Sequence, residues 1–245
     1  MKLHQNYNLR VLLGDIHGSW YVITDFLKKS NNDKICLIQV GDFGIGFESN
    51  DLEKLEKLNQ NLIDKDSHLL IIRGNHDDPF WFSEENYKYE KEKLTNIYFV
   101  PDYTVLNING DNILFIGGAI SIDRKYRLSH DMMYNTKSYW KDELVNFDYD
   151  FAEKIRNIDR IVCHTSPDFC EPVRFNNLVY SFAQNDDKLL QELRDERSNM
   201  TKLINEIMKN NNIKEYFYGH FHNSYRLYHN DCSFVCLNIN EFYCI

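Results

Sequence analysis

The sequence lacks any cysteine pair of the C-x-x-C type, and its 6 cysteines are scattered along 245 residues. This spacing argues against a disulfide framework and against a zinc knuckle. We therefore expect reduced thiols, most of them buried in apolar segments. The cysteines are Cys36, Cys163, Cys170, Cys232, Cys236 and Cys244.

An apolar leader and a membrane-spanning stretch are also missing. The first residues, Met1-Lys2-Leu3-His4-Gln5-Asn6, contain no apolar signal region. No uninterrupted apolar run approaches the roughly 20 residues that a transmembrane helix needs. We therefore expect a cytoplasmic protein with no membrane partner.

Positive charge is in deficit: Lys plus Arg number 28 against 37 Asp plus Glu, for a net charge of −9. A broad basic face is therefore not expected, and nucleic acid is not the favoured partner. A phosphate substrate stays compatible with this charge, because bound cations would reverse the local field. The sequence also has no internal repeat, low-complexity tract or linker, which favours a single domain over residues 1–245.

The sequence does contain five short motifs rich in metal-ligand residue types. They are Gly14-Asp15-Ile16-His17-Gly18, Gly41-Asp42, Gly74-Asn75-His76-Asp77, Cys163-His164 and Gly219-His220-Phe221-His222. A short apolar run of strand character precedes each motif, and sites in open α/β sheets form outside the carboxyl ends of strands. Carboxylate oxygen, imidazole nitrogen and amide oxygen together suit divalent cations of intermediate hardness. The motifs therefore predict a metal centre.

The same motifs, in this order, resemble those of the calcineurin-like metallophosphoesterases, in particular a subset from bacteria and phages. They extend from Asp15 to His222, nearly the whole chain. The resemblance implies an α/β fold, with two mixed sheets in a four-layer α/β/β/α sandwich and a dimetal site at the carboxyl ends of the strands. The residues themselves favour alternating strands and helices with the motifs at strand ends.

The resemblance also implies a role for each motif residue. One ion would be bound by Asp15, His17 and His222, and a second by Asn75, His164 and His220, with Asp42 bridging the two. His76 would be the general acid. The mixed donor set is compatible with Mn, Fe, Zn, Ni or Co, of which we expect Mn to support activity.

The function that this resemblance implies is hydrolysis of a phosphoester by a metal-bridging hydroxide. The substrate would be a phosphorylated small molecule or a nucleotide, and the choice between monoester and diester stays open. The alternative is a non-catalytic binding module on the same fold. Retention of every ligand position and of His76 favours the enzyme.

The protein Ser/Thr phosphatases of this superfamily carry a G-D-x-x-D-R-G motif, from which the sequence departs. It has Gly41-Asp42-Phe43-Gly44-Ile45-Gly46 and so lacks both the second Asp and the Arg. A protein-phosphatase function is therefore weakened, and His76 needs another orienting partner. Phosphate-binding cations must come from elsewhere; the candidates are Arg124, Arg127 and Arg174, with Lys125, although each would equally suit a surface charge.

Three segments around the motifs are harder to assign. Residues 119–143 contain few regularly spaced apolar residues and are expected to form an inserted loop over the site. The segment from Asp168 to Ala183 is also expected to be irregular. The aromatic segment from Pro79 to Tyr89 is expected to form a short helical turn over the site.

Overall fold

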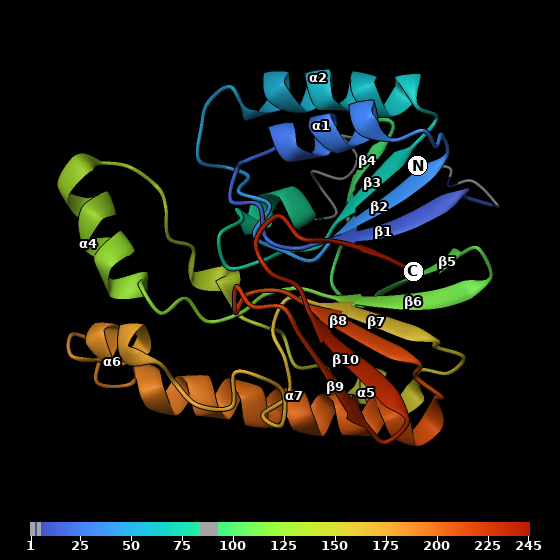
Figure 1. The fold of residues 1–245 in the computed structure, drawn as a ribbon. Helices are drawn as coiled ribbons and strands as arrows, with labels where there is room; N and C mark the ends of the chain where they lie inside the picture. The colour runs from blue at the N-terminus through green and yellow to red at the C-terminus, as the bar shows by residue number, and fades with distance from the viewer. Residues whose placement is uncertain (1–2, 4–5, 84–92) are drawn as a thin grey trace.

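The computed structural model describes residues 3, 6–83 and 93–245. Two β-sheets lie face to face, with helices against both outer surfaces (Figure 1). The first sheet has the strand order β11-β1-β2-β3-β4, and the second has the order β5-β6-β7-β8-β10-β9. The structure therefore confirms the expected four-layer α/β/β/α sandwich.

Both sheets are mixed, with parallel strands at their centres. Strands β1 to β4 run parallel, and β11 pairs antiparallel with β1. Strands β6, β7, β8 and β10 run parallel, with β5 and β9 as antiparallel edges. The first sheet contains β1 (Leu9–Leu13), β2 (Ile35–Gln39), β3 (His68–Ile71), β4 (Ile97–Phe99) and β11 (Phe242–Cys244). The second contains β5 (Thr104–Ile108), β6 (Asp111–Ile116), β7 (Arg160–Cys163), β8 (Glu215–Tyr218), β9 (Tyr225–His229) and β10 (Cys232–Cys236).

The helices form the two outer layers and part of the region beside the site. The first sheet is covered by α1 (Tyr21–Lys29) and α2 (Asp51–Asp64), and the second by α5 (Tyr149–Lys154) and α7 (Leu189–Asn210) (Figure 1). Two further helices, α4 (Arg124–Tyr134) and α6 (Asn177–Ala183), lie at one end of the sandwich. The short 3-10 helices are η1 (Pro79–Phe82) and η2 (Lys141–Glu143).

Side-chain alternation along the strands builds three apolar layers. In β1, Val11 and Leu13 belong to the cluster under α1 and α2, whereas Leu12 belongs to the cluster between the sheets. Phe115 and Val162 of the second sheet reach the same central cluster. Successive strand side chains point to opposite faces, so a strand buried on both faces is apolar throughout. This accounts for the continuous apolar runs before the motifs.

Residues 119–143 are not an irregular loop, because this stretch contains α4 and η2. That the stretch is an insert over the site stays a prediction. The only buried side chain of α4 is that of Arg127. All of its large apolar side chains are exposed, so the helix shows no apolar stripe in the sequence. The exposed apolar residues of α4 are Tyr126, Leu128, Met132, Met133 and Tyr134.

Two other segments also differ from expectation or extend beyond the described residues. The segment expected to be irregular up to Ala183 ends in α6, which begins after an N-cap formed by the side chain of Asn176. The aromatic segment after Asp78 begins with η1, as expected. Its residues 84–89 lie outside the described residues.

All six cysteines are free, as expected. Five are buried, and Cys244 is exposed. Burial raises the pKa of the Cys36 and Cys163 thiols to about 12, so these thiols stay protonated and unreactive. Among the described residues, no helix combines the length and the apolar character required to cross a membrane.

Candidate metal centre

The strand topology brings the predicted ligands to one place. Asp15 and His17 follow β1, Asp42 follows β2, and Asn75 and His76 follow β3. His164 follows β7 of the other sheet, and His220 and His222 follow β8. These strands are parallel within their sheets, so the loops that leave their carboxyl ends converge.

Four of these residues form the first group of possible ligands, with donor atoms within 4.8 Å of one another: Asp15, His17, Asp42 and His222. The Nε2 atoms of His17 and His222 are 3.0 Å apart. His222 Nε2 lies 3.2 Å from Asp15 Oδ2, and His17 Nε2 lies 3.8 Å from Asp42 Oδ2. Two nitrogens and two carboxylates therefore surround one point.

A second group is built around the other oxygen of Asp42. His164 Nε2 lies 3.2 Å from Asp42 Oδ1 and 3.0 Å from Asn75 Oδ1, and His220 completes the group. The second ring nitrogen of His164, Nδ1, donates to the Val40 carbonyl at 2.9 Å. That bond leaves the Nε2 lone pair of His164 free to bind a cation. Because Asp42 presents one oxygen to each group, it is placed to bridge two cations.

The charges in the two groups of possible ligands also suit bound cations. Asp15 and Asp42 are almost completely buried. Burial disfavours the charged form of His164, yet the carboxylates of Asp42 and Asp15 raise its pKa to about 9. Burial likewise opposes ionisation of Asp42, but the surrounding histidines hold its pKa well below the usual value. The buried carboxylates therefore attract positive charge, which a divalent cation would supply in place of protons.

The loops that carry the possible ligands contain backbone conformations that non-glycine residues rarely adopt. The φ angles of His17, Asp42, His220 and His222 are 43°, 56°, 66° and 51°. Such left-handed residues cost free energy and cluster at functional sites. At Gly74 the loop also passes so close to the backbone and carboxylate of Asp42 that a Cβ would collide with them. The surrounding fold therefore holds the loops in a strained, tight arrangement around the possible ligands.

Asp77 holds the loops together and does not orient His76. It is fully buried, and its carboxylate accepts from the backbone N–H groups of Gly44 and Gly74 at 2.7 and 2.8 Å, with longer bonds from Phe43 and Ile45. The backbone N–H of His76 donates to Asp42 Oδ1 at 2.7 Å. The His76 ring packs edge-on against that of His17, with centroids 5.2 Å apart. Burial lowers the pKa of His76, and the charge of Asp42 opposes this shift.

A buried polar network behind Asn75 was not predicted from the sequence. The amide Nδ2 of Asn75 donates to Ser121 Oγ at 2.8 Å, and Ser121 Oγ donates to Glu143 Oε2 at 2.8 Å. Arg127 binds the same carboxylate, with its Nη2 3.0 Å from Glu143 Oε2. Since Nδ2 of Asn75 is directed at Ser121, its Oδ1 faces His164 and the second ligand group. The network thus sets which end of the amide faces a cation.

Replacing Ser121 with alanine should weaken cation binding by the second group of possible ligands. Without the hydroxyl, Nδ2 of Asn75 loses its acceptor and the amide is free to rotate. Loss of such an outer partner costs about 10–100-fold in metal affinity. Titration of Mn²⁺ into metal-free protein, followed by calorimetry, measures the change. Ser166→Ala is the matched control, because Ser166 is also buried and its hydroxyl donates to the Pro167 carbonyl at 3.4 Å, away from Asn75. Equal affinities in both variants would refute the orienting role.

The three candidate phosphate-binding arginines occupy different environments. Arg127 is 6% exposed, and its N–H groups face Asp123, Ser121, Glu143 and the carbonyls of Asn75 and Ser138. Arg124 forms ion pairs with Asp186 at 2.6 Å and with Glu192 at 2.5 Å, which tie α4 to the start of α7. Arg174 is exposed and lines a cavity together with several of the possible ligands. Of the three, Arg174 alone keeps its guanidinium available to substrate.

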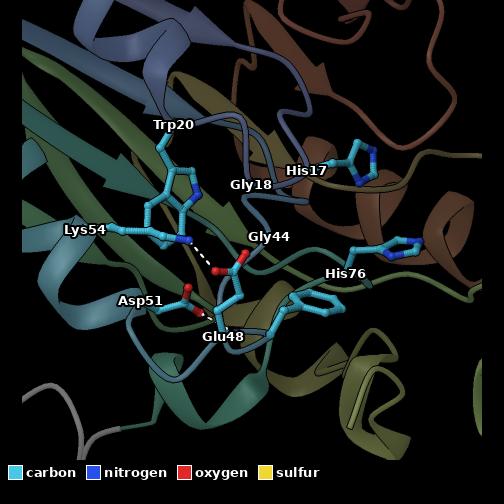
Figure 2. Close-up of a pocket in the computed structure, with 9 residues that line it drawn as sticks. His17, Gly18, Trp20, Gly44, Glu48, Asp51, Lys54 and His76 are labelled. Atoms are coloured by element: carbon cyan, nitrogen blue, oxygen red, sulfur yellow. Dashed lines mark hydrogen bonds and ion pairs between the residues drawn. The ribbon is translucent and has the colours of Figure 1, made fainter. Parts of the chain in front are cut away.

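Two cavities adjoin the ligand groups, and His76 lines both. The smaller has a volume of about 250 Å³ and lies between the loops that follow β1 and β2 and helix α2 (Figure 2). Its wall contains Trp20 and the ion pair between Lys54 and Glu48, with Nζ and Oε2 2.6 Å apart. The larger lies on the side of α6 and α7 and measures about 400 Å³. The walls combine predicted site residues with residues that the sequence did not single out, such as Lys54 of α2 and Leu193 of α7, whose pattern indicates only helix packing.

Comparisons with known proteins give a match to a family model and matches to solved structures. The family model described as calcineurin-like phosphoesterase matches residues 10–224. The crystal structure of TT1561 of Thermus thermophilus shares 11% identity, with a TM-score of 0.50 over 95% of this chain and 90% of that chain. The phosphopantetheinyl hydrolase PptH from Mycobacterium tuberculosis shares 14% identity, with a TM-score of 0.47 over 95% of this chain and 90% of that chain. No curated protein matches the sequence.

Proposed function

Since the chain belongs to the calcineurin-like phosphoesterase family, we propose that it is an active enzyme that hydrolyses a phosphoester with two divalent cations. The observation that carries the proposal is the position of Asp42. Its two oxygens face two different groups of possible ligands, 3.2 Å from His164 Nε2 and 3.8 Å from His17 Nε2. A single carboxylate shared in this way suits a pair of ions and has no evident role in a module that only binds a partner.

The residues of the chain have separate roles in this proposal. Asp15, His17 and His222 would hold one cation, and Asn75, His164 and His220 the other, with Asp42 between them. Bound cations of this kind neutralise phosphate oxygens and lower the pKa of water. His76 would donate a proton to the departing oxygen, and its ring is half-buried beside both cavities, where it can reach a bound ester. We propose Mn²⁺ as the preferred ion, with Fe, Zn, Ni or Co as alternatives for this donor set.

The proposed substrate is a small-molecule or nucleotide phosphoester. The loop after β2 carries glycine and apolar residues where the protein Ser/Thr phosphatases carry Asp and Arg, so it offers no cation to a phosphorylated protein. Arg174 is the remaining arginine candidate near the ligand groups, and among the described residues it forms no ion pair. We propose that Arg174 binds the phosphate or a second anionic group of the substrate.

The role of His76 predicts a dependence on the leaving group. Nitrophenolate leaves without protonation, whereas phenolate needs more help from a general acid. His76→Asn should therefore slow hydrolysis of phenyl phosphate esters by about 10²–10⁴-fold and that of nitrophenyl esters by much less. Initial rates with added Mn²⁺, for monoesters and for the corresponding diesters, measure this difference and show which ester class is preferred.

His130→Asn is the control for this measurement, because His130 lies on α4 outside both ligand groups. It should behave like the unmodified protein. Equal slowing of both leaving groups by His76→Asn would refute the general-acid role. Protein that binds no metal and hydrolyses neither ester class, with chelator or with Mn²⁺, would instead favour a non-catalytic binding module.

A further inference from the structure

The larger cavity next to the ligand groups has two chemically different ends. One end is formed by possible metal ligands, among them Asp42, Asn75 and His220, together with His76. The rest of the wall is mostly apolar, and its volume of about 400 Å³ falls in the usual range for small-molecule sites. The apolar residues come from the loops after β6 and β8, from the segment before α7, which includes α6, and from α7 itself. They include Ile122, Phe175, Val179, Phe182, Leu193 and Phe221.

Helix α6 covers this cavity without being buried itself. Its sequence is Asn-Leu-Val-Tyr-Ser-Phe-Ala, yet none of its residues is buried. Leu178, which lines the cavity, is 57% exposed, and Val179 and Phe182 are half-buried. Apolar surface left in contact with water costs free energy in proportion to its area, so an apolar ligand in the cavity would stabilise this helix.

The same wall also contains the guanidinium groups of two arginines, one buried and the other exposed. Arg197 is 6% exposed, and its terminal nitrogens donate to the carbonyls of Pro167, Cys170 and Pro172. Its buried Nε has no hydrogen-bond partner among the described residues. Arg174, also in this wall, adds an exposed guanidinium.

We propose that this cavity binds the organic group of the phosphoester, and that this group is predominantly apolar and about as large as an aromatic ring system. The inference rests on the proposed function and specifies its substrate class. A phosphate held by the ligand groups lies at one end of the cavity, so the remainder of the same molecule has an apolar space directly beside it. The smaller cavity suits such a group less well, because its volume is only about 250 Å³ and Trp20 and Phe47 are the only large apolar side chains in its wall (Figure 2).

Two pairs of probes test this assignment. The first pair is 2-naphthylmethyl phosphate and ethyl phosphate, each as the monoester and as its methyl diester, because both leaving alcohols are similarly acidic. The second pair is 2-naphthylmethylphosphonate and ethylphosphonate, which are not hydrolysed and report binding alone. We expect kcat/KM to favour the naphthylmethyl ester, and the Kd of its phosphonate to be lower, each by at least about tenfold.

The variant Val179→Trp fills the cavity from α6. It should weaken binding of the naphthylmethyl phosphonate by at least about tenfold and raise KM for the ester, while the ethyl probes change little. Ser181→Trp is the matched control, because it adds the same side chain to an exposed position of α6 outside the cavity. It should keep the preference of the unmodified protein.

The outcomes separate this inference from the proposed function. One outcome is that the protein hydrolyses no ester but binds the naphthylmethyl phosphonate, and that Val179→Trp weakens this binding. This outcome would support the cavity assignment and refute the proposed enzymatic activity. Hydrolysis of both esters without a naphthylmethyl preference would support the enzyme and overturn the cavity assignment. Equal loss of both phosphonates in Val179→Trp, or no difference between the two tryptophan variants, would also overturn it.

Discussion

Replacing Asp42 with asparagine should reduce phosphoester hydrolysis by at least about 10³-fold, the equivalent of about 4 kcal/mol of transition-state stabilisation. The physical reason is that Asp42 belongs to both groups of possible ligands. An amide carries no charge and offers one oxygen, so it can serve one group and not the other. The Mn²⁺ content of the purified variant should fall from two ions per chain towards one or none.

The measurement combines metal analysis with initial rates. Asp25→Asn is the matched control, because Asp25 is an exposed residue of α1 that pairs with Lys29 at 2.8 Å. It should retain both metal content and rate. A variant of Asp42 that keeps two ions and loses activity would assign this carboxylate a role other than bridging. Full activity would contradict the dimetal proposal itself.

Replacing Arg127 with methionine should have the largest effect on stability. The guanidinium is buried with Glu143, whose carboxylate is completely inaccessible. Removing one partner leaves the other as an uncompensated buried charge, which costs about 3–5 kcal/mol. For a domain of this size, that loss lowers Tm by about 10 °C. Urea unfolding followed by fluorescence measures the change.

Two further variants test the cause of this loss. Lys125→Met, at an exposed position of the same helix, should change stability by less than about 0.5 kcal/mol. Adding Glu143→Gln to Arg127→Met removes the unpaired charge and should restore part of the stability. If Arg127 instead bound substrate phosphate, Arg127→Met would raise KM and leave the unfolding curve unchanged. The two outcomes can be told apart, because a lost ion pair lowers the stability of the free protein, whereas a lost phosphate contact changes only substrate binding.

The place of Asp42 among the possible ligands was predicted from the sequence, whereas the buried ion pair of Arg127 with Glu143 was not. The comparison shows what a local sequence pattern can indicate. Asp42 follows an apolar strand and a glycine, and both signals lie within a few residues of it. Arg127 lies in a basic segment without apolar periodicity, which matches a surface loop as well as a helix. Its role depends on Glu143 and on the carbonyls of Asn75 and Ser138. Contacts with Asn75 and Glu143, which lie far from Arg127 along the chain, leave no local pattern.

The strand runs, the order of the ligand motifs and the residue types that can bind cations were all recognisable in the sequence. Strand and turn preferences are local, and ligand chemistry belongs to the individual side chain, so both can be read along the chain. Only the tertiary structure shows that Asp42 faces both ligand groups and that the Asp77 carboxylate accepts hydrogen bonds from backbone N–H groups. It also shows that the larger cavity beside His76 has a mostly apolar wall. These features depend on how segments from both sheets and from α6 and α7 pack together, because each arises from the direction in which a side chain points after folding.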